Sequence, residues 1–392
     1  MTYRVIGPFD RYNYGDLLFS LIIKNKLDSI GADSEYYGLI HSDLSRYGAV
    51  KTLPISSFYK NTVDGDKVII AGGESLCTSW ADLYSYVNGF FDFIYGNRFS
   101  KYLDRRVGIF SYAARLLCRG RSKYPFAFSS EEISSTVSIR FNAVGGAALA
   151  RWSDNKRKKF VDNISKSEVI GVRDHVTYTS IKSSFSELNV ELVPDSAILM
   201  DQVFHHELEH RDVSRQYNLP PEYIFFQVGN EKYTDLDVIY AELKKLSELT
   251  GCMILLCAIG HALGHEDVKP LSYLYERAKK ESRDDFYLIS DTLNVFELMS
   301  VIKNSSLYIG TSLHGVITSM SFGVPHVALN KSIEKVAVYL KDWGVEGLNK
   351  QCNEDEISSH ALDAISVSKK HILETVSLQK KVANDFIDRL LR

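Results

Sequence analysis

A histidine beside a predicted helix start is the residue of this sequence best placed to do chemistry. The apolar run 306–309 is followed by GTSLHG (310–315) and a helical stretch (316–322). Backbone N–H groups at a helix start bind anions, and a histidine there can exchange a proton near neutral pH. We therefore take His314 as a catalytic candidate for a reaction that releases phosphate, although a lone histidine is more often structural. Its neighbours expected to bind substrate are Thr311, Ser312, Leu313 and Gly315.

A loop after the first apolar run supplies a second candidate. It ends in Asn13-Tyr14-Gly15-Asp16 and precedes a helical stretch (17–27). Gly15 allows a tight turn, and the Asp16 carboxylate could cap the helix. Such loops lie at the carboxyl ends of strands, where α/β sheets bind ligands. A plain turn explains the pattern equally well. We take Asp16 as a catalytic candidate, and Asn13 and Gly15 as substrate-binding candidates.

Three further polar segments also follow apolar runs. Gly72, Gly73 and Glu74 follow the run 67–71, and the glycines permit close approach of a ligand or another loop. Arg173 is either a structural ion-pair partner or an anion clamp, because guanidinium binds carboxylate or phosphate through two parallel hydrogen bonds. Asp195 either lies at a ligand cleft or caps a helix. All five are substrate-binding candidates.

The elements around these residues indicate an α/β protein with two doubly wound sheets. Short apolar runs typical of buried parallel strands alternate with helical stretches on both sides of a polar linker, 205–221. We place the domains at 1–204 and 205–375, each Rossmann-like, facing each other across a ligand cleft. The last segment, 376–392, is predicted to form an amphipathic helix that could return to the first domain.

Composition and charge exclude several classes of protein. The net charge of −3 argues against general nucleic-acid binding, which needs a basic domain. The five cysteines are scattered without a C-x-x-C pair, so neither a zinc site nor a disulfide framework is indicated. The start lacks signal-peptide features and no window spans a membrane, so we expect a cytoplasmic protein.

Two other groups of residues have a plain and a sharper interpretation. Residues 77–124 are rich in aromatic and then in basic side chains. They form either a helical insertion packed on the first sheet or an acceptor-sugar platform whose basic edge rests on anionic lipid at the inner face of the membrane. His205, His206 and His210 lie in the polar linker without a recognisable metal-ligand spacing, and we predict no metal site. His261 and His265 are interpreted as a surface loop.

With these segments in order, the chain resembles the polysaccharide pyruvyl transferase family. The shared pattern has an N-x-G-D loop, a G-G-x-x-L stretch, V-R-D, D-x-A, and S-x-L-H-G followed by a helix and G-x-P. Here these are residues 13–16, 72–76, 172–174 and 195–197, then Ser-Leu-His-Gly at 312–315, without the intervening position, and finally 323–325.

The resemblance implies a GT-B-like fold, phosphoenolpyruvate as co-substrate and a sugar or glycan acceptor, free or linked to a lipid or nucleotide. It implies no other cofactor. His314 would be the general acid or base, and Arg173 would hold the donor. One departure matters: family members often carry arginine where this chain has Ser312. Lys331 or Lys335 is the expected substitute for that charge.

Two alternatives stay open. A GT-B glycosyltransferase using a nucleotide sugar could share the scaffold, because fold does not fix function. A non-catalytic sugar-binding homologue would explain the missing arginine, whereas the presence of His314 and Asp16 speaks against it.

Overall fold

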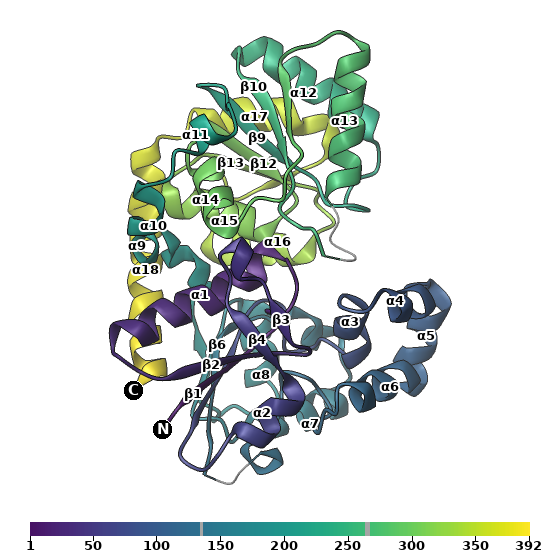
Figure 1. The fold of residues 1–392 in the computed structure, drawn as a ribbon, viewed down its shortest axis with the longest axis vertical. Coiled ribbons are helices and arrows are strands. Elements are labelled where there is room, and N and C mark those ends of the chain that lie inside the picture. Colours follow the sequence, from purple (N-terminus) through teal and green to yellow (C-terminus); the bar gives the residue numbers. More distant parts are fainter. Residues whose placement is uncertain (134–135, 263–266) are drawn as a thin grey trace. The chain divides into compact units, whose positions relative to one another are not determined.

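The chain forms two compact units, which can be followed in Figure 1. The computed structural model describes residues 1–133, 136–262 and 267–392. Unit 1 consists of Met1–Tyr12, Asp16–Ser196 and Val382–Arg392. Unit 2 consists of Asn13–Gly15 and Ala197–Lys381. Each unit is therefore assembled from separate stretches of the chain.

Unit 1 contains an eight-stranded sheet in the described residues, in the order β3-β4-β2-β1-β5-β6-β7-β8. Only β3 and β4 pair antiparallel among these neighbours. The order reverses between β1 and β5, and ligands bind at the carboxyl ends of strands at such a point. The strands are β1 (Tyr3–Ile6), β2 (Ser34–Gly38), β3 (Ser42–Asp43), β4 (Lys51–Pro54), β5 (Lys67–Ala71), β6 (Ser138–Val144), β7 (Val169–Val172) and β8 (Glu191–Leu192).

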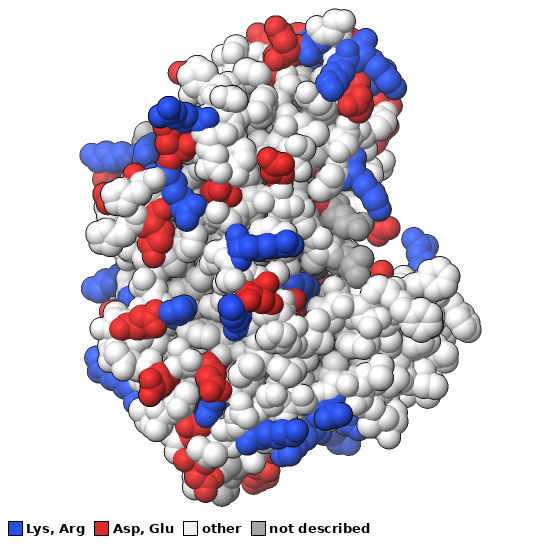
Figure 2. Space-filling view, viewed as in Figure 1, with Lys and Arg blue, Asp and Glu red and all other residues white. Residues whose placement is uncertain are grey.

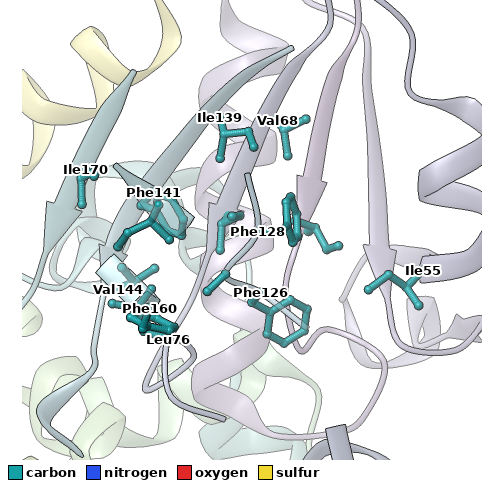
Figure 3. Close-up of a cluster of buried hydrophobic side chains, with 14 of the residues drawn as sticks. Ile55, Val68, Leu76, Phe126, Phe128, Ile139, Phe141, Val144, Phe160 and Ile170 are labelled. Carbon is teal, nitrogen blue, oxygen red and sulfur yellow. The ribbon is translucent and has the colours of Figure 1, made fainter. Parts of the chain in front are cut away.

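The core of unit 1 lies between this sheet and its helices. Figure 3 shows side chains of β5, β6 and β7 against Phe126 and Phe128, two phenylalanines of the segment that leads into β6. Trp80 of α3 joins the same cluster. The helices are α1 (Tyr14–Ser29), α2 (Ile55–Asn61), α3 (Trp80–Ser85), α4 (Gly89–Tyr95), α5 (Arg98–Val107), α6 (Ile109–Leu117), α7 (Asp154–Ile164) and α8 (His175–Lys182). Residues 77–124 thus contain the helices α3 to α6, in agreement with the expectation that this segment is helical.

Unit 2 contains a six-stranded parallel sheet in the described residues, in the order β11-β10-β9-β12-β13-β14. The order reverses between β9 and β12. The strands are β9 (Tyr223–Gln227), β10 (Met253–Cys257), β11 (Phe286–Ile289), β12 (Leu307–Gly310), β13 (His326–Leu329) and β14 (Gln351–Cys352). The main helices are α12 (Leu236–Thr250), α13 (Val268–Lys280), α14 (Val295–Lys303), α15 (Leu313–Phe322), α16 (Glu334–Trp343) and α17 (Ile357–Ile365).

The division between the units falls between Ser196 and Ala197, earlier in the chain than the expected boundary at residues 204 and 205. The polar linker is not a free connection, because it folds into short helices of unit 2. Phe204 stacks edge-on against Phe296, with ring centroids 5.4 Å apart. The linker contains α10 (His205–Glu209) and α11 (Val213–Gln216), and α9 (Met200–Val203) directly precedes it.

The last helix, α18 (Lys369–Leu391), begins in unit 2 and ends in unit 1. In unit 2, Lys380 Nζ lies 2.6 Å from a carboxylate oxygen of Asp201. In unit 1, Phe386 fills the space beside Gly171, where a Cβ would lie 2.2 Å from the phenylalanine ring. None of the helices built from the described residues is long and apolar enough to cross a membrane.

Replacing Phe386 with alanine tests how much α18 stabilises unit 1. Phe386 is buried, with 1% of its surface exposed, so Phe386→Ala should lower the free energy of unfolding by about 3–5 kcal/mol. Leu378, 67% exposed on the same helix, provides the control, and Leu378→Ala should change stability little. Equal denaturation midpoints for the two variants would show that this packing does not support unit 1.

Candidate functional site

His314 lies in the first turn of α15, where β12 ends at the order reversal of the unit 2 sheet. The helix begins at Leu313, and its N-cap is Ser312, whose hydroxyl accepts a hydrogen bond from Gly315 N–H at 3.3 Å. A serine N-cap satisfies one of the donors that a helix start leaves unpaired. The predicted helix start is therefore confirmed.

The loop Asn13–Gly15 packs directly against His314 within unit 2. A Cβ placed on Gly15 would lie 1.9 Å from His314 Nδ1, so only glycine lets the ring sit there. The hydroxyl groups of Tyr14 and Thr318 are 2.9 Å apart, and Thr318 Oγ1 donates to the His314 carbonyl at 2.6 Å. The structure thus brings together two segments separated by about three hundred residues.

Gln227, the last residue of β9, holds the loop that carries His314. Its Oε1 accepts hydrogen bonds from the backbone N–H groups of Thr311 and Ser312, both at 3.1 Å. Thr311 Oγ1 in turn accepts a hydrogen bond from Gly229 N–H at 2.9 Å. Two of the amides expected to cradle an anion are therefore directed at a side chain of the protein.

The other end of the Gln227 amide donates to Asp267. The distance from Gln227 Nε2 to Asp267 Oδ2 is 2.9 Å, and the N–H groups of Ile259 and Gly260 donate to the same oxygen at 2.9 Å each. Burial raises the pKa of Asp267 to about 6, although these hydrogen bonds favour the charged form. Gly260 also forms an isolated β-bridge with Asn13. Gly260, held by Asp267, thereby ties the loop after β10 to the Asn13–Gly15 loop that contacts His314.

Leu313 and Gly315, both expected to bind substrate, are packed against the interior of unit 2. Leu313 is buried, and a Cβ on Gly315 would lie 2.0 Å from the Tyr308 hydroxyl oxygen. Tyr308 is itself buried, which raises its pKa well above the ordinary value. Glycine at position 315 therefore lets α15 start close to β12.

Lys331, the expected substitute for the family's arginine, is paired with a carboxylate, whereas Lys232 lies beside the loop that precedes His314. Lys331 Nζ lies 2.6 Å from Glu356 Oε2, so its charge is paired with a carboxylate. Lys232 is exposed and lies in the loop after β9, where its Cγ would be 3.1 Å from a Cβ on Gly229. The same Cβ would be 3.5 Å from Thr311 Oγ1. Of these two lysines, Lys232 is the one that the structure places beside the motif.

Arg173 in unit 1 is held between two carboxylates. Its Nη1 lies 3.0 Å from Asp195 Oδ2 and its Nη2 lies 3.1 Å from Glu74 Oε2. Burial lowers the pKa of Arg173, but the charges of Asp195, Glu74 and Asp174 and the hydrogen bond to Asp195 together outweigh it, so the net shift is upward. Glu74 Oε1 also accepts from Ala147 N–H at 2.7 Å. This geometry fits the ion-pair interpretation of Arg173 rather than the anion clamp.

The glycine pair after β5 lies beside Asp16. Gly72 and Gly73 have φ of +118° and +43°, and a Cβ on Gly73 would be 3.2 Å from Asp16 Oδ1. Arg11 Nη2 lies 3.1 Å from Asp16 Oδ2, and its guanidinium stands 5.0 Å over the Tyr86 ring. These residues gather at the order reversal of the unit 1 sheet.

The first loop differs from the prediction at Asp16, and it contains a buried carboxylate, Asp10, that was not predicted. Asp16 is not the N-cap of α1, because the helix already begins at Tyr14 and Asp16 falls in its first turn, where it complements the helix dipole. Asp10 was not predicted: it is buried, which raises its pKa, and it accepts from Ile40 N–H at 3.1 Å. The Asp10-Arg11 pair directly after the first strand was the available signal.

Two histidines of the polar linker, His205 and His206, lie near one carboxylate. His205 Nε2 is 2.9 Å from Glu209 Oε1, while His206 Nδ1 is 3.8 Å from Glu209 Oε2. Across residues 1–133, 136–262 and 267–392, no three His, Cys, Asp or Glu side chains are grouped so that they could hold a metal ion. His261 is partly buried, which lowers its pKa, and His265 lies outside the described residues.

Comparison with known proteins points to one family and one fold. A sequence profile described as polysaccharide pyruvyl transferase matches residues 13–332, whereas no curated protein matches the chain. UDP-GlcNAc 2-epimerase from Neisseria meningitidis bound to UDP-GlcNAc has a TM-score of 0.60 at 10% identity, covering 100% of this chain and 99% of that one. The N-terminal domain of Candida albicans trehalose-6-phosphate phosphatase gives 0.55 at 10% identity, covering 100% and 98%. At such identities the likeness shows the fold, two Rossmann-like domains of the GT-B type.

Removing the Arg173 charge tests whether it is a structural ion-pair partner. Arg173→Met leaves the fully buried Asp195 without its nearest counter-charge and should lower the free energy of unfolding by about 3–5 kcal/mol. The double variant Arg173→Met with Asp195→Leu should recover much of that loss, because neither charge then remains buried. Chemical denaturation measures both. Equal stability of Arg173→Met and the parent protein would contradict the structural role.

Proposed function

The chain belongs to the polysaccharide pyruvyl transferase family, and from this membership we propose that it transfers a pyruvyl group from phosphoenolpyruvate to a sugar. The observation that supports the proposal best is the packing of His314 against the Asn13–Gly15 loop. Two motifs far apart in the sequence thereby surround one titratable side chain at the order reversal of a parallel sheet, where ligands bind.

The proposed reaction has two steps. A sugar hydroxyl adds to C2 of phosphoenolpyruvate: the C2–O bond forms, a proton is delivered to C3, and the hydroxyl proton is removed. A second hydroxyl of the same sugar then loses its proton, forms the second C2–O bond, displaces phosphate from C2 and closes a cyclic ketal. His314 can serve as the general acid or base in these transfers, and no redox cofactor or metal enters the scheme.

We assign recognition of the anionic donor to Lys232 rather than to Arg173 or Lys331. Arg173 is already matched by Glu74 and Asp195, and Lys331 is paired with Glu356. Lys232 lies next to Gly229 and Thr311, on the side of unit 2 that carries His314. A lysine ammonium there attracts a carboxylate or phosphate, and it would supply the charge that the family's usual arginine provides.

The acceptor is proposed to be a hydroxylated sugar or glycan of cell-surface polysaccharide biosynthesis, free or carried by a lipid or nucleotide. The reaction would take place in the cytoplasm. The second candidate function is transfer from a nucleotide sugar. It is favoured by the fold shared with the UDP-GlcNAc-bound epimerase from Neisseria meningitidis.

Phosphate release from phosphoenolpyruvate in the presence of a panel of sugars tests the reaction. Acceptor-dependent release should occur with the parent protein and fall by at least about a hundredfold in His314→Ala, since general acid–base catalysis contributes that much. His371→Ala is the matched control, because His371 is exposed on α18. Gly15→Ala should also lose activity, as its methyl group would displace the His314 ring.

Thermal shift in the same samples separates the two candidate functions. Stabilisation by phosphoenolpyruvate together with phosphate release supports pyruvyl transfer. Stabilisation by a nucleotide sugar but not by phosphoenolpyruvate would replace pyruvyl transfer with the glycosyltransferase function. Full activity of a folded His314→Ala variant would remove His314 from the chemistry.

The lysine assignment predicts a difference between two single variants. Lys232→Ala should raise KM for phosphoenolpyruvate by roughly tenfold, the usual effect of losing a charge-assisted hydrogen bond. Lys331→Ala should leave KM near the parent value, because its charge faces Glu356. Steady-state kinetics with varied phosphoenolpyruvate checks both. The opposite pattern would give the donor to Lys331.

A further inference from the structure

Helices α4, α5 and α6 form an ordered projection of unit 1, inserted between β5 and β6 (Figure 1). Its own small core contains Phe91, Tyr95 and Phe110, whose ring centroids lie 5.6–6.3 Å apart. The Asp104 carboxylate accepts from the backbone and hydroxyl of Ser111 at 2.9 and 2.6 Å. The projection is therefore a folded surface and not a loose loop.

The outer surface of this projection is apolar to an unusual degree. Phe90 is 76% exposed, Phe93 84% and Phe99 72%. On α6, Ile109, Tyr112 and Leu116 are all more than half exposed. These three lie at i, i+3 and i+7, which is the spacing that a helix normally turns towards a core. Figure 2 shows the view over α4 and α5 as mostly white, with blue Lys and Arg atoms at its margin.

The charges of the same segment are almost all positive. Residues 89–123 contain eight Lys and Arg residues, against the two acidic residues Asp92 and Asp104, and Asp104 is buried. The guanidinium of Arg106 stands 5.5 Å from the Tyr102 ring and that of Arg115 stands 5.3 Å from the Tyr112 ring. Basic groups therefore lie directly beside the exposed aromatic side chains.

We propose that α4, α5 and α6 dock on an anionic lipid surface. Exposed Phe, Ile and Leu side chains can enter the boundary between headgroups and acyl chains, while flanking Lys and Arg attract anionic headgroups. A second copy of the chain fits this surface less well, since two such positive faces repel each other. The aliphatic Ile109 and Leu116 gain little from a nucleic acid, where base stacking uses aromatic rings.

Flotation with lipid vesicles tests this surface independently of the proposed reaction. The full chain should float with vesicles of phosphatidylcholine and phosphatidylglycerol and stay behind with phosphatidylcholine alone. Binding should weaken at high salt, because ions screen the basic side chains. A chain that stays behind with both kinds of vesicle would overturn the proposal, whatever its activity towards phosphoenolpyruvate.

Two double variants separate the apolar from the charged contribution. Phe90→Ser with Phe93→Ser, and Arg105→Gln with Arg106→Gln, should each weaken binding to the anionic vesicles by about tenfold or more. Leu378→Ser with Lys370→Gln is the matched control on α18, where both side chains are exposed, and should bind like the parent.

Three results would assign the surface to something else. Binding unchanged in both double variants would mean that another face contacts the lipid. A dimer in sedimentation velocity that the Phe90→Ser, Phe93→Ser variant converts to monomer, without vesicle binding, would assign the surface to a second copy. Retention of single-stranded oligonucleotides but not of vesicles would assign it to nucleic acid.

Discussion

The arrangement around His314 depends on the side-chain amide of Gln227. Gln227 is the last residue of the central strand β9. Its side-chain oxygen accepts hydrogen bonds from the backbone amides of Thr311 and Ser312, and its side-chain nitrogen donates to the carboxylate of Asp267. An amide can do this because it carries an acceptor and a donor on one rigid plane. The start of α15 and the loop after β10 are therefore fixed relative to the same strand. A histidine on α15 inherits that precision, since its backbone has no freedom to shift without breaking buried hydrogen bonds.

In unit 1, the loops at the strand ends are held by ion pairs instead of by a side-chain amide. Arg173 connects Glu74, after β5, to Asp195, after β8, so one guanidinium joins the ends of well-separated strands. An ion pair of this kind contributes little net stability but makes the loss of one partner costly. The two units thus use different chemistry for the same task, which is to hold loops at the carboxyl edge of a parallel sheet.

Much of this fold could be predicted from the sequence, while the connections within the site could not. Apolar runs such as 67–71 and 306–309 identified central strands because burial on both faces demands continuous apolar residues. The mixed sequence of β2 and the short β14 carry no such signal and were missed. The start of α15 was predictable from Ser312 and the small residues before it. Gln227 and Asp267 were not, because one polar residue at a strand end says nothing about a partner forty positions away. The sequence allowed Arg173 to be either an ion-pair partner or an anion clamp, because the carboxylates of Glu74 and Asp195 that surround it in the fold are far away in the sequence.

The division of the chain between the units bears on how the protein is made and on how it could be dissected. Unit 1 takes its first strand from the beginning of the chain and the end of α18 from its last eleven residues, Val382–Arg392. During synthesis, unit 2 can collect all of its residues before unit 1 does, even though unit 1 emerges first from the ribosome. No single cut yields both units intact, so expression of either one alone requires rejoining distant segments. For the same reason, one recombination event could not exchange a complete unit between related genes.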